Sequence, residues 1–158
     1  GNVLEDEAKP WYELEYGVTI TRVGFCTTDD GRIGCSPDGL IGEDSGIEIK
    51  CPEPTAHVKY LLAGDLPKQY RAQVQGCMFV TGRPSWKFVS YRRGFPKLVL
   101  TIERNQEAQD TLQIVLDDFI ASFSEQFAKI VERNGGLPPK RKPFVASPVE
   151  DDKPDIMP

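Results

Sequence analysis

Apolar and polar residues alternate over residues 46–51, where Ile47 and Ile49 are separated by Glu48 and followed by Lys50. A period of two predicts a strand with the isoleucines on one face and the charged side chains on the other. With this strand at 46–51, comparable patterns predict further strands over residues 18–26, 32–35, 38–42, 86–91 and 98–102. The Thr-Asp-Asp-Gly sequence at 28–31 predicts a hairpin turn between the first two.

Apolar residues recur with a helical period in four other segments. They predict helices over residues 2–16, 53–63 and 65–81, and a long helix that begins near 105. Asp65 is the expected N-cap of the third helix, and Gly64 ends the second. The long helix has an apolar stripe expected to face the core, comprising Ala108, Leu112, Val115, Phe119, Phe123, Phe127 and Ile130.

Length and composition indicate one domain of 158 residues with 39% hydrophobic residues. We expect this domain to span 1–136 and a Pro-rich, charged tail at 137–158 to be disordered. No apolar run reaches membrane-spanning length, and the acidic N-terminal segment does not have a signal-peptide pattern. The four cysteines occur singly, without a Cys-x-x-Cys pair, which argues against a zinc or iron–sulfur site and favours free thiols.

The net charge of −5 is unevenly distributed along the chain. Residues 1–49 hold 11 acidic and 3 basic residues, a balance of −8, and residues 105–158 have a balance of −4. The middle block, 50–104, holds 3 acidic and 10 basic residues, a balance of +7, with tyrosines and a tryptophan interspersed. Phosphate contacts need local positive charge, so this block is compatible with nucleic-acid binding, although an ordinary mixed surface has the same composition.

Asp38, Glu48 and Lys50 are the candidate catalytic residues. Asp38 begins one predicted strand, and Glu48 and Lys50 share a face of the next. Mg²⁺ (magnesium) usually takes one or two protein carboxylates, and a lysine beside them can stabilise charge on a phosphate or hold water. The alternative is an Asp-Gly turn beside a solvated Glu-x-Lys face. The flanking isoleucines instead indicate a central strand, where charged pairs are uncommon.

Three motifs, the second of them in two parts, occur in the order that resembles the YqaJ-like viral recombinase family, which includes phage lambda exonuclease, within the PD-(D/E)xK nuclease superfamily. Residues 36–40 (Ser-Pro-Asp-Gly-Leu) and 46–52 (Gly-x-Glu-x-Lys-Cys-Pro) resemble its active-site core. Residues 1–5 resemble its Gly-x-x-x-Glu helix, and 70–75 (Tyr-Arg-Ala-Gln-Val-Gln) its glutamine helix. The resemblance implies a restriction-endonuclease-like α/β fold with a mixed central sheet flanked by helices. It also implies that an upstream N-terminal part is missing.

The resemblance assigns roles to individual residues. It implies that Glu5, Asp38, Glu48 and the main-chain carbonyl of Ile49 bind Mg²⁺, for which Mn²⁺ can substitute. It also implies that Gln73 orients the nucleophile. The cations expected to bind DNA are Lys59, Lys68, Arg71, Arg92 and Arg93. Gln75, on another side of the helix, is expected to be structural, and His57, the single histidine, to be at the surface or facing DNA rather than acting as a base.

The predicted function is metal-dependent hydrolysis of linear double-stranded DNA, as a phage-type exonuclease in recombination. The resemblance implies that the partner is a single-strand annealing recombinase. It also implies a homotrimeric assembly. The expected location is the cytoplasm of a bacterial host or of a phage-infected cell. One alternative is another nuclease of the superfamily, such as an endonuclease or a Cas4-like enzyme; the missing cysteine cluster argues against the latter. The other is a non-catalytic DNA-binding or assembly module descended from a nuclease.

Overall fold

The computed structural model describes residues 2–137, and the chain divides after Ala121 into two compact units. The elements in chain order are α1 (Asn2–Tyr16), β1 (Ile20–Thr21), β2 (Cys26–Thr27), β3 (Gly34–Cys35), β4 (Gly39–Ile41), β5 (Ser45–Lys50), α2 (Pro54–Ala63), α3 (Lys68–Thr81), β6 (Ser85–Ser90), β7 (Leu98–Glu103) and α4 (Gln106–Arg133). The first unit holds every strand of the described chain. In the second, the described residues are the latter half of α4 and the turn that follows it.

The first unit is built on a five-stranded mixed sheet in the order β1-β4-β5-β6-β7. Strands β5 and β6 pair in parallel, and the other neighbours are antiparallel. A separate two-stranded hairpin pairs β2 with β3. The mixed sheet with flanking helices confirms the predicted α/β fold class.

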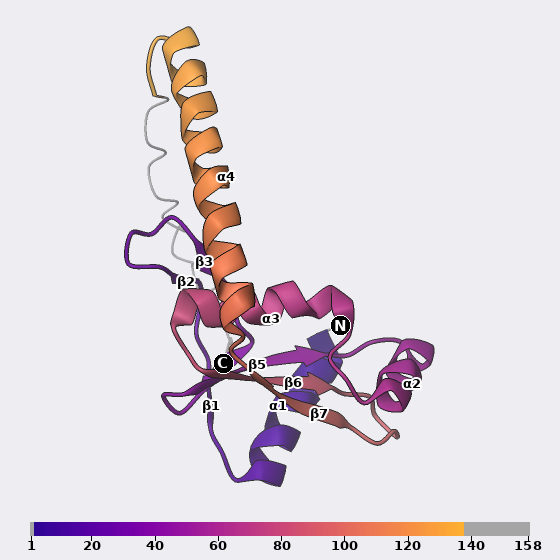
Figure 1. Ribbon diagram of the computed structural model, residues 1–158. Coiled ribbons are helices and arrows are strands. Elements are labelled where there is room, and N and C mark those ends of the chain that lie inside the picture. The colour runs from indigo at the N-terminus through magenta and orange to yellow at the C-terminus, as the bar shows by residue number, and fades with distance from the viewer. Residues whose placement is uncertain (1, 138–158) are drawn as a thin grey trace, which may run out of the picture. The chain divides into compact units, whose positions relative to one another are not determined.

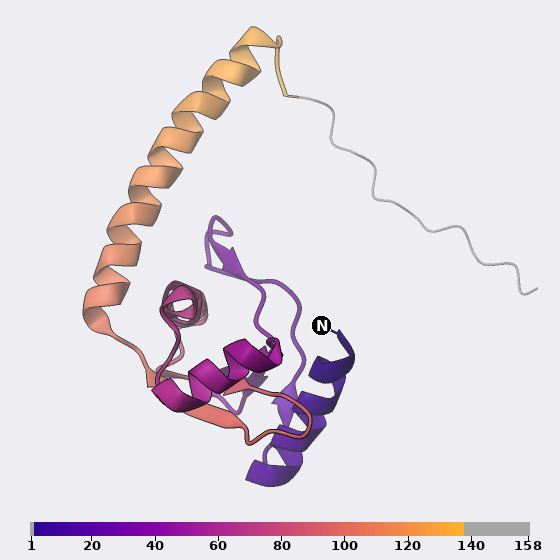
Figure 2. The ribbon, with the colours of Figure 1, turned by 90° about the vertical axis from the view of Figure 1, so that its right-hand side faces the viewer.

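Helices α1 and α3 cover opposite faces of this sheet (Figures 1 and 2). Because side chains alternate along β5, Ile47 and Ile49 pack on the α1 side with Ala8 and Tyr12. Trp86 and Phe88 of β6 point to the α3 side. Gly46 lies under the Trp86 ring, where an added Cβ would come within 2.2 Å of a ring carbon. Glu48 therefore points to the α3 side, between a tightly packed tryptophan and the end of the strand.

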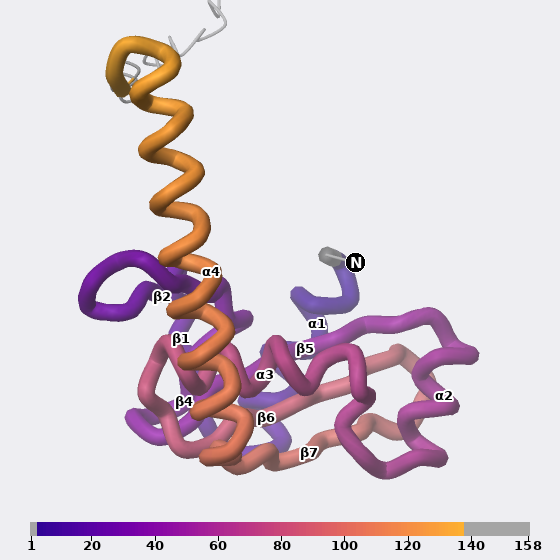
Figure 3. Tube along the Cα trace, turned by 45° about the horizontal axis from the view of Figure 1, so that its top comes forward, coloured from indigo at the N-terminus to yellow at the C-terminus, as the bar shows by residue number. Residues whose placement is uncertain are grey.

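Helix α2 lies beyond the ends of β5 and β6 (Figure 3) and begins the crossover between these parallel strands. Pro54 is its first residue, where the missing N–H costs nothing. Gly64 ends it in the left-handed conformation, with φ of 61°, and donates its N–H to the carbonyl of Tyr60. The predicted end at Gly64 is confirmed.

The strand predicted over 18–26 is wrong in extent. The backbone pairs with β4 at Ile20–Thr21 and with β3 at Cys26–Thr27, so the segment passes from one sheet to the other. The hairpin itself forms about the predicted turn, with Gly31 at φ of 68° and its N–H bonded to the carbonyl of Thr28. Cys26 faces Cys35 across this hairpin, and both are free thiols.

Two helix predictions also need correction. Asp65 does not cap α3: Pro67 occupies the N-cap position, and the Asp65 carboxylate instead accepts a bond from the N–H of Leu66. The apolar stripe of α4 is not a core stripe. Within the first unit Val115 is 58% exposed, and neither core cluster of the described residues includes a side chain of this stripe.

In the second unit Phe127 and Ile130 are 45% and 56% exposed. Helix α4 ends near the predicted glycine pair, and both Gly135 and Gly136 have positive φ. No helix of residues 2–137 is both long and apolar enough to cross a membrane. The tail predicted over 137–158 lies, except for Leu137, outside the described residues.

Candidate active site

The site is centred on Glu48, which is 2% exposed in the middle of the sheet. Its Oε1 accepts a hydrogen bond of 2.8 Å from the side-chain amide of Gln73 in α3. The same oxygen pairs with the ammonium of Lys50, two residues further along β5. The strand places both charged groups on one face, and the helix above that face supplies the amide. The structure thus brings together three of the four predicted catalytic residues.

Asp38, the fourth, directly precedes β4. Its Oδ2 accepts a hydrogen bond of 2.7 Å from the backbone N–H of Ile49. This bond holds the carboxylate against β5, and the charge of Asp38 contributes to the raised pKa of Glu48. The bond also brings Asp38 to the main chain of Ile49, although a metal-binding role of the Ile49 carbonyl remains a prediction.

Burial controls the electrostatics of the ion pair. Loss of water raises the pKa of Glu48, and the charge of Asp38 adds to this, while Lys50 and Gln73 oppose it. For Lys50 burial acts in the lowering direction, but its bond to Glu48 and the two carboxylate charges prevail, so its pKa is raised. Lys50 is therefore a cation at neutral pH.

The second oxygen of Glu48, Oε2, is buried without a hydrogen-bond partner among the described residues. Burying an ionised oxygen without a hydrogen-bond partner costs folding free energy, unless a ligand binds to that oxygen. Asp38 and Glu48 together offer the hard oxygen donors that Mg²⁺ prefers, so the residues present fit such an ion. Within residues 2–137, however, no three acidic, cysteine or histidine side chains converge closely enough to form a complete metal site.

Glu5 is not brought into contact with the other two carboxylates. It is half-buried on α1, which packs against β5. Burial raises the pKa of Cys51, just beyond β5, to about 11, and the charges of Glu5 and Asp38 contribute. Glu5 therefore lies within electrostatic range of the end of β5. Its role as a third metal ligand remains a prediction.

The candidate DNA-binding cations divide into two sets. Lys59 and Lys68 are exposed on α2 and α3. The three arginines are held by neighbouring groups: Arg92 donates to the carbonyl of Pro52, Arg93 pairs with Glu7, and Arg71 pairs with Asp65. Arg92 and Arg93 follow the last residue of β6. Because β5 and β6 are parallel, these arginines lie at the same end of the sheet as the last residue of β5. Their contact with DNA remains a prediction.

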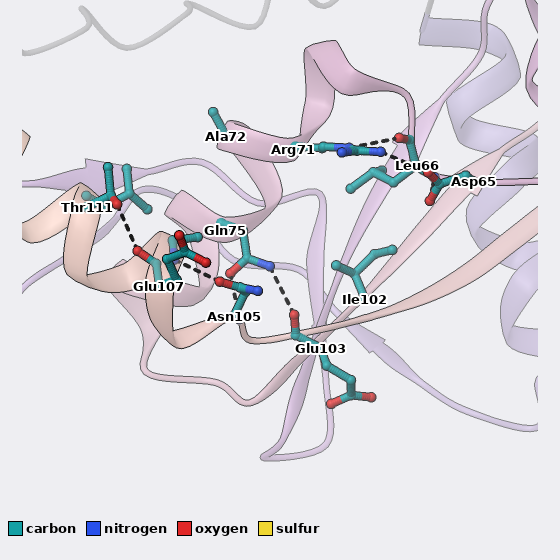
Figure 4. A pocket seen from close by; sticks show the side chains of 12 residues that line it. Asp65, Leu66, Arg71, Ala72, Gln75, Ile102, Glu103, Asn105, Glu107 and Thr111 are labelled. Atoms are coloured by element: carbon teal, nitrogen blue, oxygen red, sulfur yellow. Dashed lines mark hydrogen bonds and ion pairs between the residues drawn. The ribbon is translucent and has the colours of Figure 1, made fainter.

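A groove of about 670 Å³ lies on another side of α3 (Figure 4). Its lining comes from α3 and the segment that precedes it, from the end of β7 and from the start of α4. Gln75 donates to the carbonyl of Glu103 and accepts from the N–H of Asn105, which confirms that this glutamine is structural. The residues that line the groove do not include Asp38, Glu48, Lys50 or Gln73. A smaller hollow, of about 340 Å³, is lined in part by Gln73 and Ser36 and borders the candidate site.

His57 was predicted at the surface or facing DNA, and this is wrong. The side chain is fully buried, with Nδ1 2.8 Å from Oγ of Ser90 and Nε2 2.8 Å from the carbonyl of Pro96. A carbonyl only accepts, so Nε2 carries a proton and donates it. His57 thereby ties α2 to β6 and to the loop that carries Arg92 and Arg93. A single histidine among apolar helix positions gave no signal for these distant partners.

Tyr70 of α3 contacts the site, and sequence reasoning missed this contact. Its ring centroid lies 5.2 Å from the Lys50 ammonium. The other contacts of this ring are with Phe88 and Tyr60. No pattern in the sequence links position 70 to position 50.

Comparisons with known proteins find similarity both in sequence and in fold. A profile of the YqaJ-like viral recombinase domain matches residues 1–84. Two solved structures are similar: an alkaline exonuclease, LHK-Exo, from Laribacter hongkongensis, and LHK-Exo in complex with dAMP. Each has 30% sequence identity and a TM-score of 0.79, over 85% of this chain and 72% of the other. A comparison with curated proteins finds no match.

Proposed function

The chain belongs to the YqaJ-like viral recombinase family, and we propose that it is a Mg²⁺-dependent exonuclease that hydrolyses the phosphodiester bonds of linear double-stranded DNA. The observation that carries the proposal is the buried carboxylate of Glu48. It lies between an ammonium and an amide, and its second oxygen has no partner among the described residues. LHK-Exo, whose fold this chain shares, is an alkaline exonuclease.

In this proposal Asp38 and Glu48 hold the metal ion, with Glu5 and the carbonyl of Ile49 as further ligands, and Mn²⁺ can replace Mg²⁺. When bound, the cation supplies Lewis-acid stabilisation of the charge that develops on the phosphate. The hydrogen bond from the N–H of Ile49 keeps Asp38 oriented, and the bond from Gln73 keeps Glu48 oriented. These bonds reduce the reorganisation needed during the reaction.

Lys50 acts directly on the reacting groups. Its ammonium is cationic at neutral pH and partly exposed, so it can donate to a phosphate oxygen or hold the attacking water. Gln73 has an amide that can also orient this water. The basic side chains at the surrounding surface bind the DNA phosphates, and they comprise Lys59, Lys68, Arg71, Arg92 and Arg93.

The biological setting follows the family. We propose that the protein acts in phage-type recombination in the cytoplasm of a bacterial host or phage-infected cell. A single-strand annealing recombinase is the proposed partner, and a homotrimer the proposed assembly.

The test compares end-labelled linear duplex DNA with closed circular plasmid, in Mg²⁺, in Mn²⁺ and in excess EDTA. An exonuclease releases nucleotides from the linear DNA in either metal and leaves the closed circle intact. Cleavage of the circle would identify an endonuclease instead. Undiminished hydrolysis in EDTA would contradict the metal-dependent mechanism. DNA binding without any hydrolysis would identify a non-catalytic module derived from a nuclease.

A further inference from the structure

Helix α3 contacts both members of the central ion pair. Gln73 bonds to Glu48, and the ring of Tyr70, three residues earlier, lies 5.2 Å from the Nζ atom of Lys50. Residues three apart share a helix face, so one surface of α3 meets the carboxylate and the ammonium together. A cation within about 6 Å of a ring centroid is attracted by the negative face of the ring.

The Tyr70 ring is itself held in place. Phe88 of β6 packs against it at a centroid distance of 5.4 Å and an interplanar angle of 32°. Tyr60 of α2 meets it edge to face at 6.3 Å and 84°. The hydroxyl of Tyr60 accepts a hydrogen bond of 3.1 Å from the side chain of Gln69. The position of the ring is thus set from the sheet and from the neighbouring helix.

Lys50 needs such support, because its long flexible side chain is 27% exposed at the end of β5. We propose that Tyr70 is a positioning residue for Lys50, whose aromatic face keeps the ammonium over the site rather than in solvent. This role rests on the proposed function of Lys50. It depends on the aromatic ring and not on the hydroxyl group.

The test measures kcat and KM of Tyr70→Leu and Tyr70→Phe over a range of linear DNA concentrations at saturating Mg²⁺. Loss of the ring contact lowers kcat by about twofold to thirtyfold, the range expected for a cation–π interaction, and leaves KM within about twofold. Tyr70→Phe keeps the ring and restores the parental kcat. Val74→Ala, a core substitution in the same helix, controls for loss of stability. Equal losses in Tyr70→Leu and Tyr70→Phe, or a change in KM alone, would overturn the inference.

A second measurement does not depend on nuclease activity. Reductive methylation followed by mass spectrometry gives the labelling rate of Lys50, with the exposed Lys59 as the internal reference. The rate for Lys50 relative to Lys59 rises severalfold in Tyr70→Leu and stays unchanged in Tyr70→Phe. An unchanged ratio in Tyr70→Leu would refute the positioning role. If the parental protein cleaves no DNA but the labelling ratio still rises in Tyr70→Leu, the result counts against the proposed function and not against the positioning role.

Discussion

The side-chain amide of Gln73 donates to Oε1 of Glu48 at 2.8 Å, across 25 positions of the sequence. Lys50 pairs with the same oxygen, so one side of the carboxylate is fully engaged by the protein. The other oxygen, Oε2, is buried without a partner in the described part of the chain. Gln73 therefore helps to determine which oxygen of Glu48 remains available to a ligand.

Substitution of Gln73 tests this orienting role. Gln73→Ala removes a hydrogen bond to a charged acceptor, which is worth about 1.5–3 kcal/mol. We expect kcat on linear duplex DNA to fall by about tenfold to a hundredfold. Gln75→Ala is the matched control, because Gln75 bonds only away from the site among the described contacts. A Gln73→Ala enzyme as active as the parent would show that the amide is dispensable.

Lys50→Ala should abolish most hydrolysis while leaving DNA binding and folding intact. A single electrostatic donor of this kind typically contributes on the order of 10²–10³ in rate, because its charge is needed chiefly in the transition state. Single-turnover cleavage measures the rate, and fluorescence anisotropy with labelled DNA measures the binding. Cleavage by Lys50→Ala within a few-fold of the parent would make the residue structural.

Glu5→Gln distinguishes a metal ligand from a surface carboxylate. If Glu5 binds the metal, the substitution weakens Mn²⁺ binding, as measured by titration calorimetry, and raises the Mg²⁺ concentration needed for half-maximal activity. Asp6→Gln, one position along the same helix and exposed, is the control. Equal metal affinities in Glu5→Gln, Asp6→Gln and the parent would remove Glu5 from the ligand set.

The raised pKa of Glu48 predicts a pH-dependent cost in stability. The folded protein binds this proton more tightly than the unfolded chain does, so stability falls as pH rises from below the ordinary value of 4.5 through the raised value. Glu48→Gln removes the buried charge. It should therefore increase the free energy of unfolding at pH 7 without metal, and the gain should vanish below pH 4.5.

Urea unfolding at pH 7 and pH 4 in EDTA measures this effect, with the exposed Glu43→Gln as the control. Added Mg²⁺ should stabilise the parent and not Glu48→Gln, since a ligand of the folded state alone raises its stability. A less stable Glu48→Gln protein at pH 7 would mean that the pairing with Lys50 outweighs the burial of the carboxylate.

His57→Ala should destabilise the protein by about 3 kcal/mol, because it leaves the buried Ser90 hydroxyl and the Pro96 carbonyl without their hydrogen bonds. Chemical denaturation measures the change. Lys59→Ala, exposed on the same helix, should cost less than about 0.5 kcal/mol. Similar losses in the two variants would argue against the buried contacts of His57.

The central strand could be predicted from the sequence because its information is local. Alternation alone placed Glu48 and Lys50 on one face of β5, and the structure agrees. Gln73 was placed only by the family resemblance. The partners of His57 could not be inferred, since Ser90 and Pro96 are more than thirty positions away and helical period does not encode them.

The α4 stripe shows the opposite limit. Its apolar residues have helical spacing, and the helix forms, but spacing does not tell which surface, if any, they cover. Val115 has the predicted helical spacing and is nevertheless 58% exposed. The prediction for Glu5 was met in part. The helix that carries Glu5 was predicted, but its carboxylate does not contact Asp38 or Glu48 in the structure. The position of that carboxylate depends on how the helix packs, which periodicity does not encode.

The parallel pairing of β5 with β6 has a consequence for how the protein is made. Each residue of β5 pairs with one forty positions later, from Ser45 with Ser85 to Lys50 with Ser90. Such long-range pairing is slow, because a long loop must close before any contact forms. On the ribosome Asp38, Glu48 and Lys50 emerge well before the strand that completes the sheet around them. The five-stranded sheet that carries the candidate site is therefore complete only after β6 and β7 have been synthesised, and we expect a chain that ends before Ser85 to lack DNA hydrolysis.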